Sequence, residues 1–156
     1  LLQRLATSGC KTGHRDLLIG AASTVADYNG SGNARHIRDK LTELYFQSEL
    51  SAGCALASVY SARKSPSGVY FPDSLYINIA KLQGVNAIWN GNYITGDIAG
   101  GLVCTVPTAK DLKDDIIGKY VEKYFKAKEG VPTENRIRMM RLIEYLTGQG
   151  SVVPME

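Results

Sequence analysis

The sequence predicts an all-α fold, an antiparallel bundle of about four or five helices joined by short loops. Apolar residues recur at intervals of three and four residues over most of the chain, which is the spacing along one face of a helix. Clusters of glycine, asparagine and proline divide these stretches into helix-sized segments. The β-like run at residues 102–106 has no partner with which to build a sheet, so we expect an extended connector there.

The first two predicted helices are separated by a turn rich in asparagine and glycine. Residues 15–28 carry the helical pattern, and residues 29–32 end it, because Asn and Gly readily adopt the left-handed backbone of a C-cap. Asn33 is the expected N-cap of a long second helix that runs to about residue 62. Small residues fill the second half of that helix, so we expect a neighbouring helix to approach closely there.

Three further helices are expected in the second half of the chain. The third begins at Ser74 and runs towards residue 101, and we expect its apolar pattern to be a core or subunit contact: Leu75, Ile79, Leu82, Asn86, Trp89 and Tyr93. The fourth begins in a segment that resembles a capping box, residues 108–111, and closes at Gly130. Pro132 opens the fifth helix.

The composition is that of a globular domain. Of the 156 residues, 44% are hydrophobic and 21% are charged, which excludes a disordered chain, collagen and a coiled-coil rod. We expect one helical domain over residues 1–156. The chain starts without an initiator Met, and its first residues resemble the middle of a helix, so we expect a piece of a longer protein.

Charge and cysteine content narrow the classes of partner and compartment. The net charge of +3 is spread along the chain, so a nucleic-acid partner is not expected. No apolar run approaches the roughly 18 residues of a membrane span, so we expect no membrane partner. Cys10, Cys54 and Cys104 are far apart and odd in number, which favours a reducing, cytoplasmic compartment over a disulfide framework. With only His14 and His36 present, the sequence contains no complete zinc-ligand pattern.

Two short motifs contain residues suited to chemistry. In residues 8–13, Cys10 is followed by Lys11 between glycines; a neighbouring cation favours the thiolate, although an inert cysteine in a loop or helix kink is the reading that the residues alone favour. In residues 96–101, the pair Gly100 and Gly101 could present free backbone N–H groups to a pyrophosphate, or could simply be a glycine C-cap. A third basic segment, residues 35–38, is better interpreted as a solvated helix face.

Five segments together resemble a known family. They are Ser-Gly-Cys-Lys-Thr-Gly (8–13), Ala-Asp-Tyr-Asn-Gly (26–30), Asp-Ile-Ala-Gly-Gly-Leu (97–102), Thr-Val-Pro-Thr-Ala-Lys-Asp (105–111) and Arg-Met-Met-Arg-Leu-Ile-Glu (138–144). In this order the chain resembles the C-terminal helical domain of the flavoprotein family that includes 4-hydroxybutyryl-CoA dehydratase/vinylacetyl-CoA isomerase and 4-hydroxyphenylacetate 3-monooxygenase. The resemblance implies an acyl-CoA-dehydrogenase-like homo-oligomer, a homotetramer or related dimer, in which a helical part and a β part precede this bundle.

The resemblance also implies roles for particular residues. FAD lies against Asp97, Gly100 and Gly101, and Lys11 and Glu156 position or protonate the substrate. In the dehydratase branch a [4Fe-4S] cluster has three Cys ligands and one His, and the last Cys matches Cys10. Two positions depart from that branch: Gln3 stands where the His ligand is expected, and Thr7 stands where a Tyr is expected.

Three functions follow as hypotheses. We favour a divergent dehydratase/isomerase acting on acyl-CoA, with its cluster altered or absent. The alternative is a 4-hydroxyphenylacetate 3-monooxygenase, which needs reduced flavin from a flavin reductase partner, oxygen and a phenolic substrate, and has no use for Cys10. The third hypothesis is a non-catalytic helical scaffold that keeps the fold without the chemistry.

Overall fold

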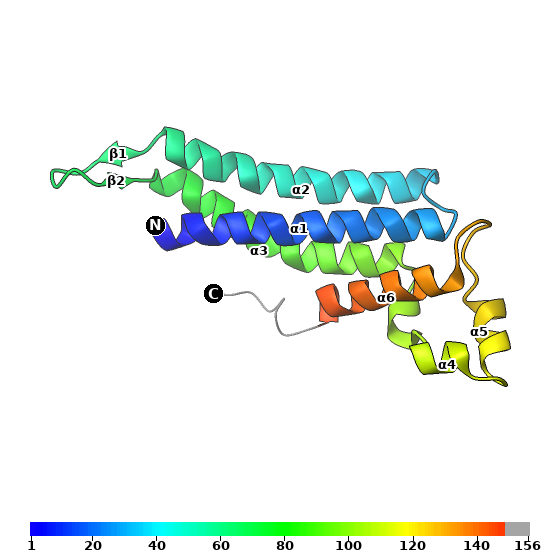
Figure 1. Ribbon diagram of the computed structural model, residues 1–156. Helices are drawn as coiled ribbons and strands as arrows, with labels where there is room; N and C mark the ends of the chain where they lie inside the picture. The colour runs from blue at the N-terminus through cyan, green and yellow to red at the C-terminus, as the bar shows by residue number, and fades with distance from the viewer. Residues whose placement is uncertain (149–156) are drawn as a thin grey trace. The chain divides into compact units, whose positions relative to one another are not determined.

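The computed structural model describes residues 1–148 and is mostly helical, which confirms the predicted fold class. Figure 1 shows three long helices followed by shorter ones: α1 (Leu2–Tyr28), α2 (Arg35–Tyr60), α3 (Ser74–Ile98), the 3-10 helix η1 (Leu102–Thr105), α4 (Ala109–Lys113), α5 (Gly118–Tyr124) and α6 (Thr133–Gly148). Between α2 and α3, the short strands β1 (Arg63–Lys64) and β2 (Tyr70–Phe71) pair antiparallel. None of the helices in the described residues is long and apolar enough to cross a membrane.

The chain divides into two compact units. Unit 1 comprises Leu1–Leu17 and Thr42–Gly91, and unit 2 comprises Leu18–Leu41 and the chain from Asn92 onward. Each long helix therefore contributes residues to both units. The two candidate motifs fall into different units, because residues 8–13 lie in unit 1 and residues 96–101 lie in unit 2.

Unit 1 is built on close contacts between small residues. Ser48, Ser51 and Ser58 of α2 are all at most 1% exposed. The Ser51 hydroxyl donates a hydrogen bond to the backbone carbonyl of Ala80 on α3, 3.1 Å away. The Asp73 backbone N–H donates to the Ser58 carbonyl at 2.9 Å, just before α3 begins. The close approach predicted for the second half of the second helix is thus confirmed.

In unit 2, a buried arginine joins segments that are far apart in sequence. Arg136 on α6 donates from Nε to the Asn29 side chain at 2.9 Å and from Nη1 to the Lys126 carbonyl at 3.1 Å. The backbone N–H of Lys128 donates to the Tyr28 carbonyl at 2.8 Å. Around these bonds lies an apolar core in which Ala22, Val25, Met140 and Ile143 have no exposed surface.

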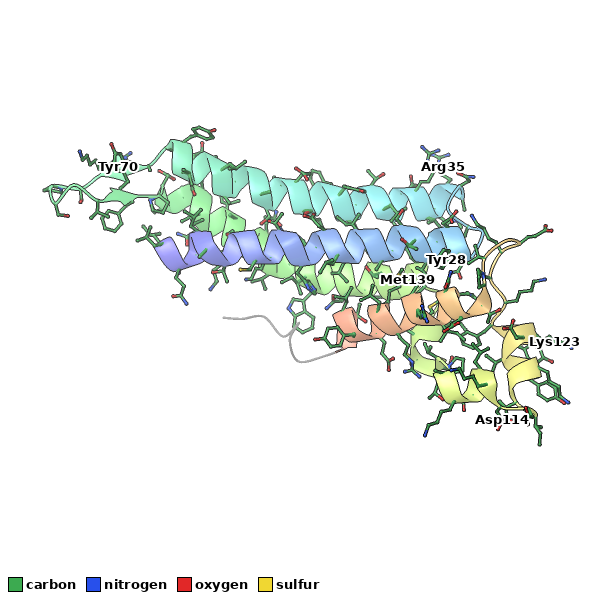
Figure 2. All side chains as sticks on the ribbon, in the orientation of Figure 1. Tyr28, Arg35, Tyr70, Asp114, Lys123 and Met139 are labelled. Carbon is green, nitrogen blue, oxygen red and sulfur yellow. The ribbon has the colours of Figure 1, made fainter. Side chains whose placement is uncertain are left out.

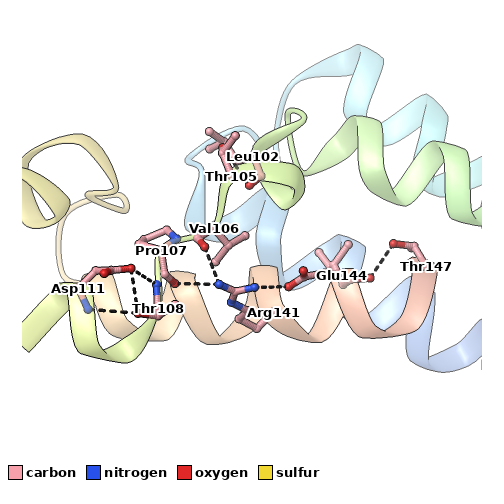
Figure 3. Close-up of polar contacts among 10 residues, drawn as sticks. Leu102, Thr105, Val106, Pro107, Thr108, Asp111, Arg141, Glu144 and Thr147 are labelled. Atoms are coloured by element: carbon pink, nitrogen blue, oxygen red, sulfur yellow. Dashed lines mark hydrogen bonds and ion pairs between the residues drawn. The ribbon is translucent and has the colours of Figure 1, made fainter. Parts of the chain in front are cut away.

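The segment that leads into α4 is fixed by two sets of polar contacts (Figure 3). Thr108 and Asp111 form a reciprocal capping box, as the sequence predicted. Hydrogen bonds from the Thr108 backbone and hydroxyl lower the pKa of the Asp111 carboxyl. Arg141 on α6 donates to the Val106 carbonyl at 2.6 Å and pairs with Glu144 at 2.5 Å. These contacts attach the connector before α4 to α6.

The predicted start of the first helix is wrong. The helix begins at Leu2, not residue 15, so residues 8–13 are neither a loop nor a kink. Serine and glycine are weak helix formers, but tertiary burial of one helix face outweighs local propensity. Ser8, Lys11 and Arg15 are each at most 7% exposed on that face.

The apolar pattern of the third helix is largely exposed within the described chain. Leu75, Leu82 and Trp89 are 65%, 64% and 62% exposed, whereas Ile77 and Ala80 are fully buried. The buried side of α3 carries alanines together with isoleucines, namely Ala80, Ala87, Ile77, Ile88, Ile94 and Ile98. The predicted pattern is therefore not the core of this chain, and its interpretation as a subunit contact stays a prediction.

Four local predictions need correction. Residues 102–105 form a 3-10 helix and not an extended connector. The second helix begins at Arg35, and the first bonds of its ladder go to the Ala34 carbonyl, so Asn33 is not its N-cap. A small sheet is present after all, and it exposes Tyr70 at 62% (Figure 2). The predicted fourth helix is two helices, α4 and α5, because the Asp114 carboxylate accepts from the N–H groups of residues 116 and 117 at 2.8 Å and competes with the helical ladder.

Two glycine substitutions test how tightly the helices are packed. A Cβ on Gly118 would lie 2.6 Å from the Leu112 carbonyl oxygen, so we expect Gly118→Ala to lower the free energy of unfolding. The cost of such overpacking is about 1–3 kcal/mol. A Cβ on the exposed Gly20 of α1 would meet nothing within 4 Å. Gly20→Ala should therefore gain about 0.5–1 kcal/mol. Urea unfolding of the purified protein measures both, and equal midpoints for the two variants would contradict this account.

Candidate functional site

The structure separates Cys10 from Lys11. Both lie in the middle of α1, where successive side chains point about 100° apart around the helix axis. Cys10 is exposed, while Lys11 is only 7% exposed. The thiol of Cys10 therefore lies at the surface and the ammonium of Lys11 is buried, so the two do not form one reactive pair.

Lys11 belongs to a cluster of basic side chains on one face of α1. His14 and Arg15 follow it at positions i+3 and i+4, which bring side chains to the same side of a helix. Arg15, only 3% exposed, donates from Nε to the Ser48 hydroxyl at 3.4 Å and from Nη2 to the Thr12 hydroxyl at 3.0 Å. Lys11 Nζ, His14 Nε2 and Arg15 Nη1 are buried without a hydrogen-bond partner.

The electrostatics of the cluster are those of crowded, desolvated cations. Burial lowers the pKa of Lys11, and the positive charges of Lys81 and Arg15 lower it further. Burial likewise lowers the pKa of His14, with a second contribution from Arg15. Burial also lowers the pKa of Arg15, while the neighbouring Asp16 opposes that shift. No described ion pair includes Lys11 or Arg15.

Gly84 on α3 completes the surroundings of this cluster. A Cβ at Gly84 would lie 3.3 Å from Lys11 Cδ and 3.5 Å from both Arg15 Nη1 and Ser51 Oγ. Side chains from α1 and α2 thus converge on a position where an added Cβ would be in close contact with them. Sequence reasoning missed His14, Arg15 and Gly84, although the basic i, i+3, i+4 spacing was a signal that could have found the first two.

A groove runs beside the cluster, between α1 and α2. It has a volume of about 490 Å³. Its one charged lining residue is Asp16, and the others are apolar or small: Leu5, Ser8, Gly9, Thr12 and Gly13 from α1, with Ala52, Ala55, Leu56 and Val59 from α2. A Cβ added at Gly9 or Gly13 would meet nothing within 4 Å. The two glycines therefore leave these two positions on the α1 side of the groove without side chains. Because Thr12 also accepts the hydrogen bond from Arg15, the groove lies one side chain away from the buried cations.

The glycine pair after α3 forms a C-cap. Gly100 and Gly101 have φ values of 78° and 74°, the left-handed region that favours glycine. Their N–H groups donate to the carbonyls of Asp97 at 2.9 Å and Gly96 at 3.3 Å, the two bonds of a Schellman motif. The expected free N–H groups are therefore wrong, because the helix end uses them. A Cβ on either glycine would stand in open space, so the pair offers a flat surface to a ligand, beside the ion pair of Asp97 with Lys40.

The described residues hold only part of the ligand set expected for a metal cluster. Gln3 is exposed and lies two turns before Cys10, and the Thr7 hydroxyl donates to the Gln3 backbone carbonyl. Within residues 1–148, no group of three or more His, Cys, Asp or Glu side chains could hold a metal ion. The exposed Cys10 thiol could supply one ligand, and the other ligands would have to come from elsewhere. Glu156 lies outside the described residues.

Comparison with known proteins decides the family. The model of the family described as 4-hydroxyphenylacetate 3-hydroxylase C terminal (HpaB) matches residues 1–153. The chain belongs to this family. It is 34% identical over 158 residues to an enzyme, the 4-hydroxybutyryl-CoA dehydratase/vinylacetyl-CoA-Delta-isomerase of Clostridium aminobutyricum, covering 96% of this chain and 32% of the relative. It is 28% identical over 144 residues to the pyoverdin chromophore biosynthetic protein PvcC of Pseudomonas aeruginosa, covering 90% of this chain and 28% of that protein.

Solved structures of HpaB-family proteins have the same helical fold. An archaeal 4-hydroxybutyryl-CoA dehydratase from N. maritimus matches with a TM-score of 0.83 and 40% identity, over 88% of this chain and 28% of that one. The HpaB oxygenase component of 4-hydroxyphenylacetate 3-monooxygenase, complexed with FAD and 4-hydroxyphenylacetate, matches with a TM-score of 0.86 and 20% identity, over 96% of this chain and 31% of that one. This chain thus spans about a third of the length of its relatives.

The lowered pKa of His14 predicts a pH-dependent stability. Because the folded-state pKa lies below the ordinary value of 6.5, the neutral ring is favoured in the fold. The contribution of the neutral His14 ring to the free energy of unfolding is fully present above pH 6.5. It is lost as the pH falls below that value, because the unfolded chain then binds more protons than the folded one. We expect the melting temperature to fall less in His14→Gln than in the wild type between about pH 7.5 and about pH 5.5. His36→Gln, at an exposed position on α2, is the control, and identical pH profiles for His14→Gln and wild type would refute the prediction.

Proposed function

We propose that this chain is the C-terminal domain of an FAD-dependent enzyme on the dehydratase/isomerase side of the HpaB family. The observation that carries the proposal is the identity of 34% and 40% to two 4-hydroxybutyryl-CoA dehydratases, against 20% to the HpaB oxygenase component. In this proposal the substrate is an acyl-CoA thioester, and the enzyme is a homo-oligomer in the cytoplasm. The exposed apolar residues of α3 are then covered by the remainder of the protein or by another subunit.

We propose different roles for the buried and the exposed residues of the Cys10–Lys11 motif. Lys11 positions the substrate or gives it a proton, and Glu156 does so from the end of the chain. Cys10 is the exposed thiol that would ligate a cluster. Gln3 binds metals only through a hard amide oxygen, which suits an iron–sulfur site poorly. We therefore propose that any cluster is altered or absent.

The flavin is proposed to lie against residues 97–101. When bound, it would supply the electron relay that removing an unactivated hydrogen requires. The N–H groups of Gly100 and Gly101 are used in the C-cap, so a pyrophosphate gains little there. The exposed, side-chain-free surface of the pair suits the flat adenosine end of FAD, which can stack closely on a backbone that lacks Cβ atoms.

The second candidate is a reduced-flavin monooxygenase acting on a phenol, with a flavin reductase partner. The departures at Gln3 and Thr7 favour it, because a monooxygenase needs neither a cluster nor its His ligand. A monooxygenase gives Cys10 no role in the reaction, and we therefore place this candidate second.

Flavin contact at the glycine pair can be tested by blocking its surface. We expect Gly100→Val in the full-length protein to weaken FAD binding at least about tenfold, or about 1.4 kcal/mol, because the side chain enters the space proposed for the ligand. Gly130→Val is a matched control, since Gly130 has a φ of 81° and an equally open Cβ position and suffers the same backbone strain. Titration calorimetry measures both. Equal affinities in Gly100→Val and wild type would leave the glycine pair a C-cap alone.

The choice of reaction depends on metal content and substrate. Anaerobically purified full-length protein should show a flavin absorption band and convert 4-hydroxybutyryl-CoA or vinylacetyl-CoA, with less iron and sulfide than a complete cluster requires. Hydroxylation of 4-hydroxyphenylacetate with a reductase, and no action on either thioester, would establish the monooxygenase instead. Absence of any flavin band would favour the non-catalytic scaffold.

A further inference from the structure

We propose that two copies of this chain associate through unit 2, the turn of residues 114–117 of each copy lying in the cleft between α4 and α6 of the other. The proposal rests on the proposed function only in so far as that function names a homo-oligomer, and it adds the surface that joins two subunits. Three features of unit 2 carry it: an open cleft, an exposed apolar turn beside the cleft, and opposite charges on the two.

The cleft between α4 and α6 combines an apolar lining with cations. Its volume is about 590 Å³, and clefts of this size take groups as large as a small-molecule ligand, which is the bulk of a few side chains. The apolar lining residues are Pro107, Ala109, Leu112 and Ile137. The cleft therefore suits apolar side chains from another segment.

The charges of the cleft leave one cation to be paired. Arg138 on α6 pairs with Glu134, which also lines the cleft. Arg141 pairs with Glu144 (Figure 3). Lys113 at the end of α4 lines the cleft, is exposed, and forms no ion pair among the described residues. A carboxylate that enters with the apolar side chains would therefore meet Lys113.

The turn between α4 and α5 has the complementary character. Ile116 and Ile117 are 71% and 48% exposed. Asp115 beside them is also exposed and forms no ion pair among the described residues. Burying two isoleucines removes apolar surface from water, which favours association. The turn thus presents an apolar pair together with the negative charge that the cleft lacks.

The backbone of the turn is fixed before any partner binds. Asp114, labelled in Figure 2, accepts hydrogen bonds from the N–H groups of residues 116 and 117 at 2.8 Å. Gly118 packs against the backbone carbonyl of Leu112, a residue that lines the cleft. The cleft and the turn are therefore joined in one ordered piece, and preorganisation of this kind lowers the entropic cost of binding.

The position of the turn favours a second copy as the occupant of the cleft. Helix α4 forms one wall of the cleft and leads directly into the turn. A two-fold axis beside α4 would place each turn in the cleft of the other copy, with Lys113 of each copy against Asp115 of the other. A surface that carries both a shape and its complement closes on itself in a symmetric dimer.

Zero-length cross-linking tests the contact directly. Full-length protein with and without nitrogen-15 label is mixed until native mass spectrometry shows mixed oligomers, and a carbodiimide then joins lysine amines to the carboxylates they contact. We expect an amide between Lys113 and Asp115 that links one labelled and one unlabelled peptide. Absence of that mixed product would overturn the proposal. A cross-link from Lys113 to a carboxylate outside residues 1–156 would also overturn it, because the rest of the polypeptide would then cover the cleft.

Charge reversal tests the pair in the same protein. Lys113→Glu and Asp115→Lys should each raise the dissociation constant for subunit separation at least about tenfold, because like charges then face each other. The double variant exchanges the two charges and should return close to wild type. Lys64→Glu, at an exposed lysine of β1, is the matched control and should change nothing. Sedimentation velocity measures all four variants, and a double variant as weak as the two single ones would refute the pairing.

The outcomes separate this surface from the proposed function. A mixed-label amide in a protein without a flavin band would count against the proposed function alone. A flavoenzyme whose subunits separate at the same concentration in wild type and in both single reversals would count against this surface alone.

Discussion

The absence of a side chain at Gly84 is the constraint on which unit 1 depends. Lys11, Arg15 and Ser51 all approach the place where a Cβ would stand, the nearest at 3.3 Å. A Cβ there would press on the Lys11 stem and touch the Arg15 guanidinium and the Ser51 hydroxyl, which donates to the Ala80 carbonyl. The contact between α2 and α3 and the surroundings of the basic cluster therefore meet at this glycine.

Other positions require glycine for two different reasons, a lack of space for a Cβ or a left-handed backbone. Gly118 has no room for a Cβ beside the Leu112 carbonyl, so it is a packing glycine like Gly84. Gly100 and Gly101 have open space around them and are needed for their left-handed backbone, which closes the end of α3. We propose this second kind as a flavin contact, which would be made through an exposed surface without side chains, since the N–H groups are used in the C-cap.

Neighbouring residues of the Ser-Gly-Cys-Lys-Thr-Gly motif face different surroundings because the motif is helical. Cys10 is on the surface, Lys11 is enclosed, and Ser8, Gly9, Thr12 and Gly13 line a groove.

The sequence by itself determined the helical class, the capping box at Thr108 and Asp111 and the family, because each depends on local spacing or on a contiguous motif. Only the tertiary structure decided that α1 begins at Leu2, that the Ile77 and Ala80 face of α3 is buried in place of the Leu75 and Trp89 face, and that Lys11 and Arg15 meet at Gly84. Periodicity tells which residues share a helix face, but it does not tell which face a neighbouring helix will cover. That choice depends on how side chains from several helices pack together, and α3 has apolar residues on more than one face, so its own periodicity does not select the buried one.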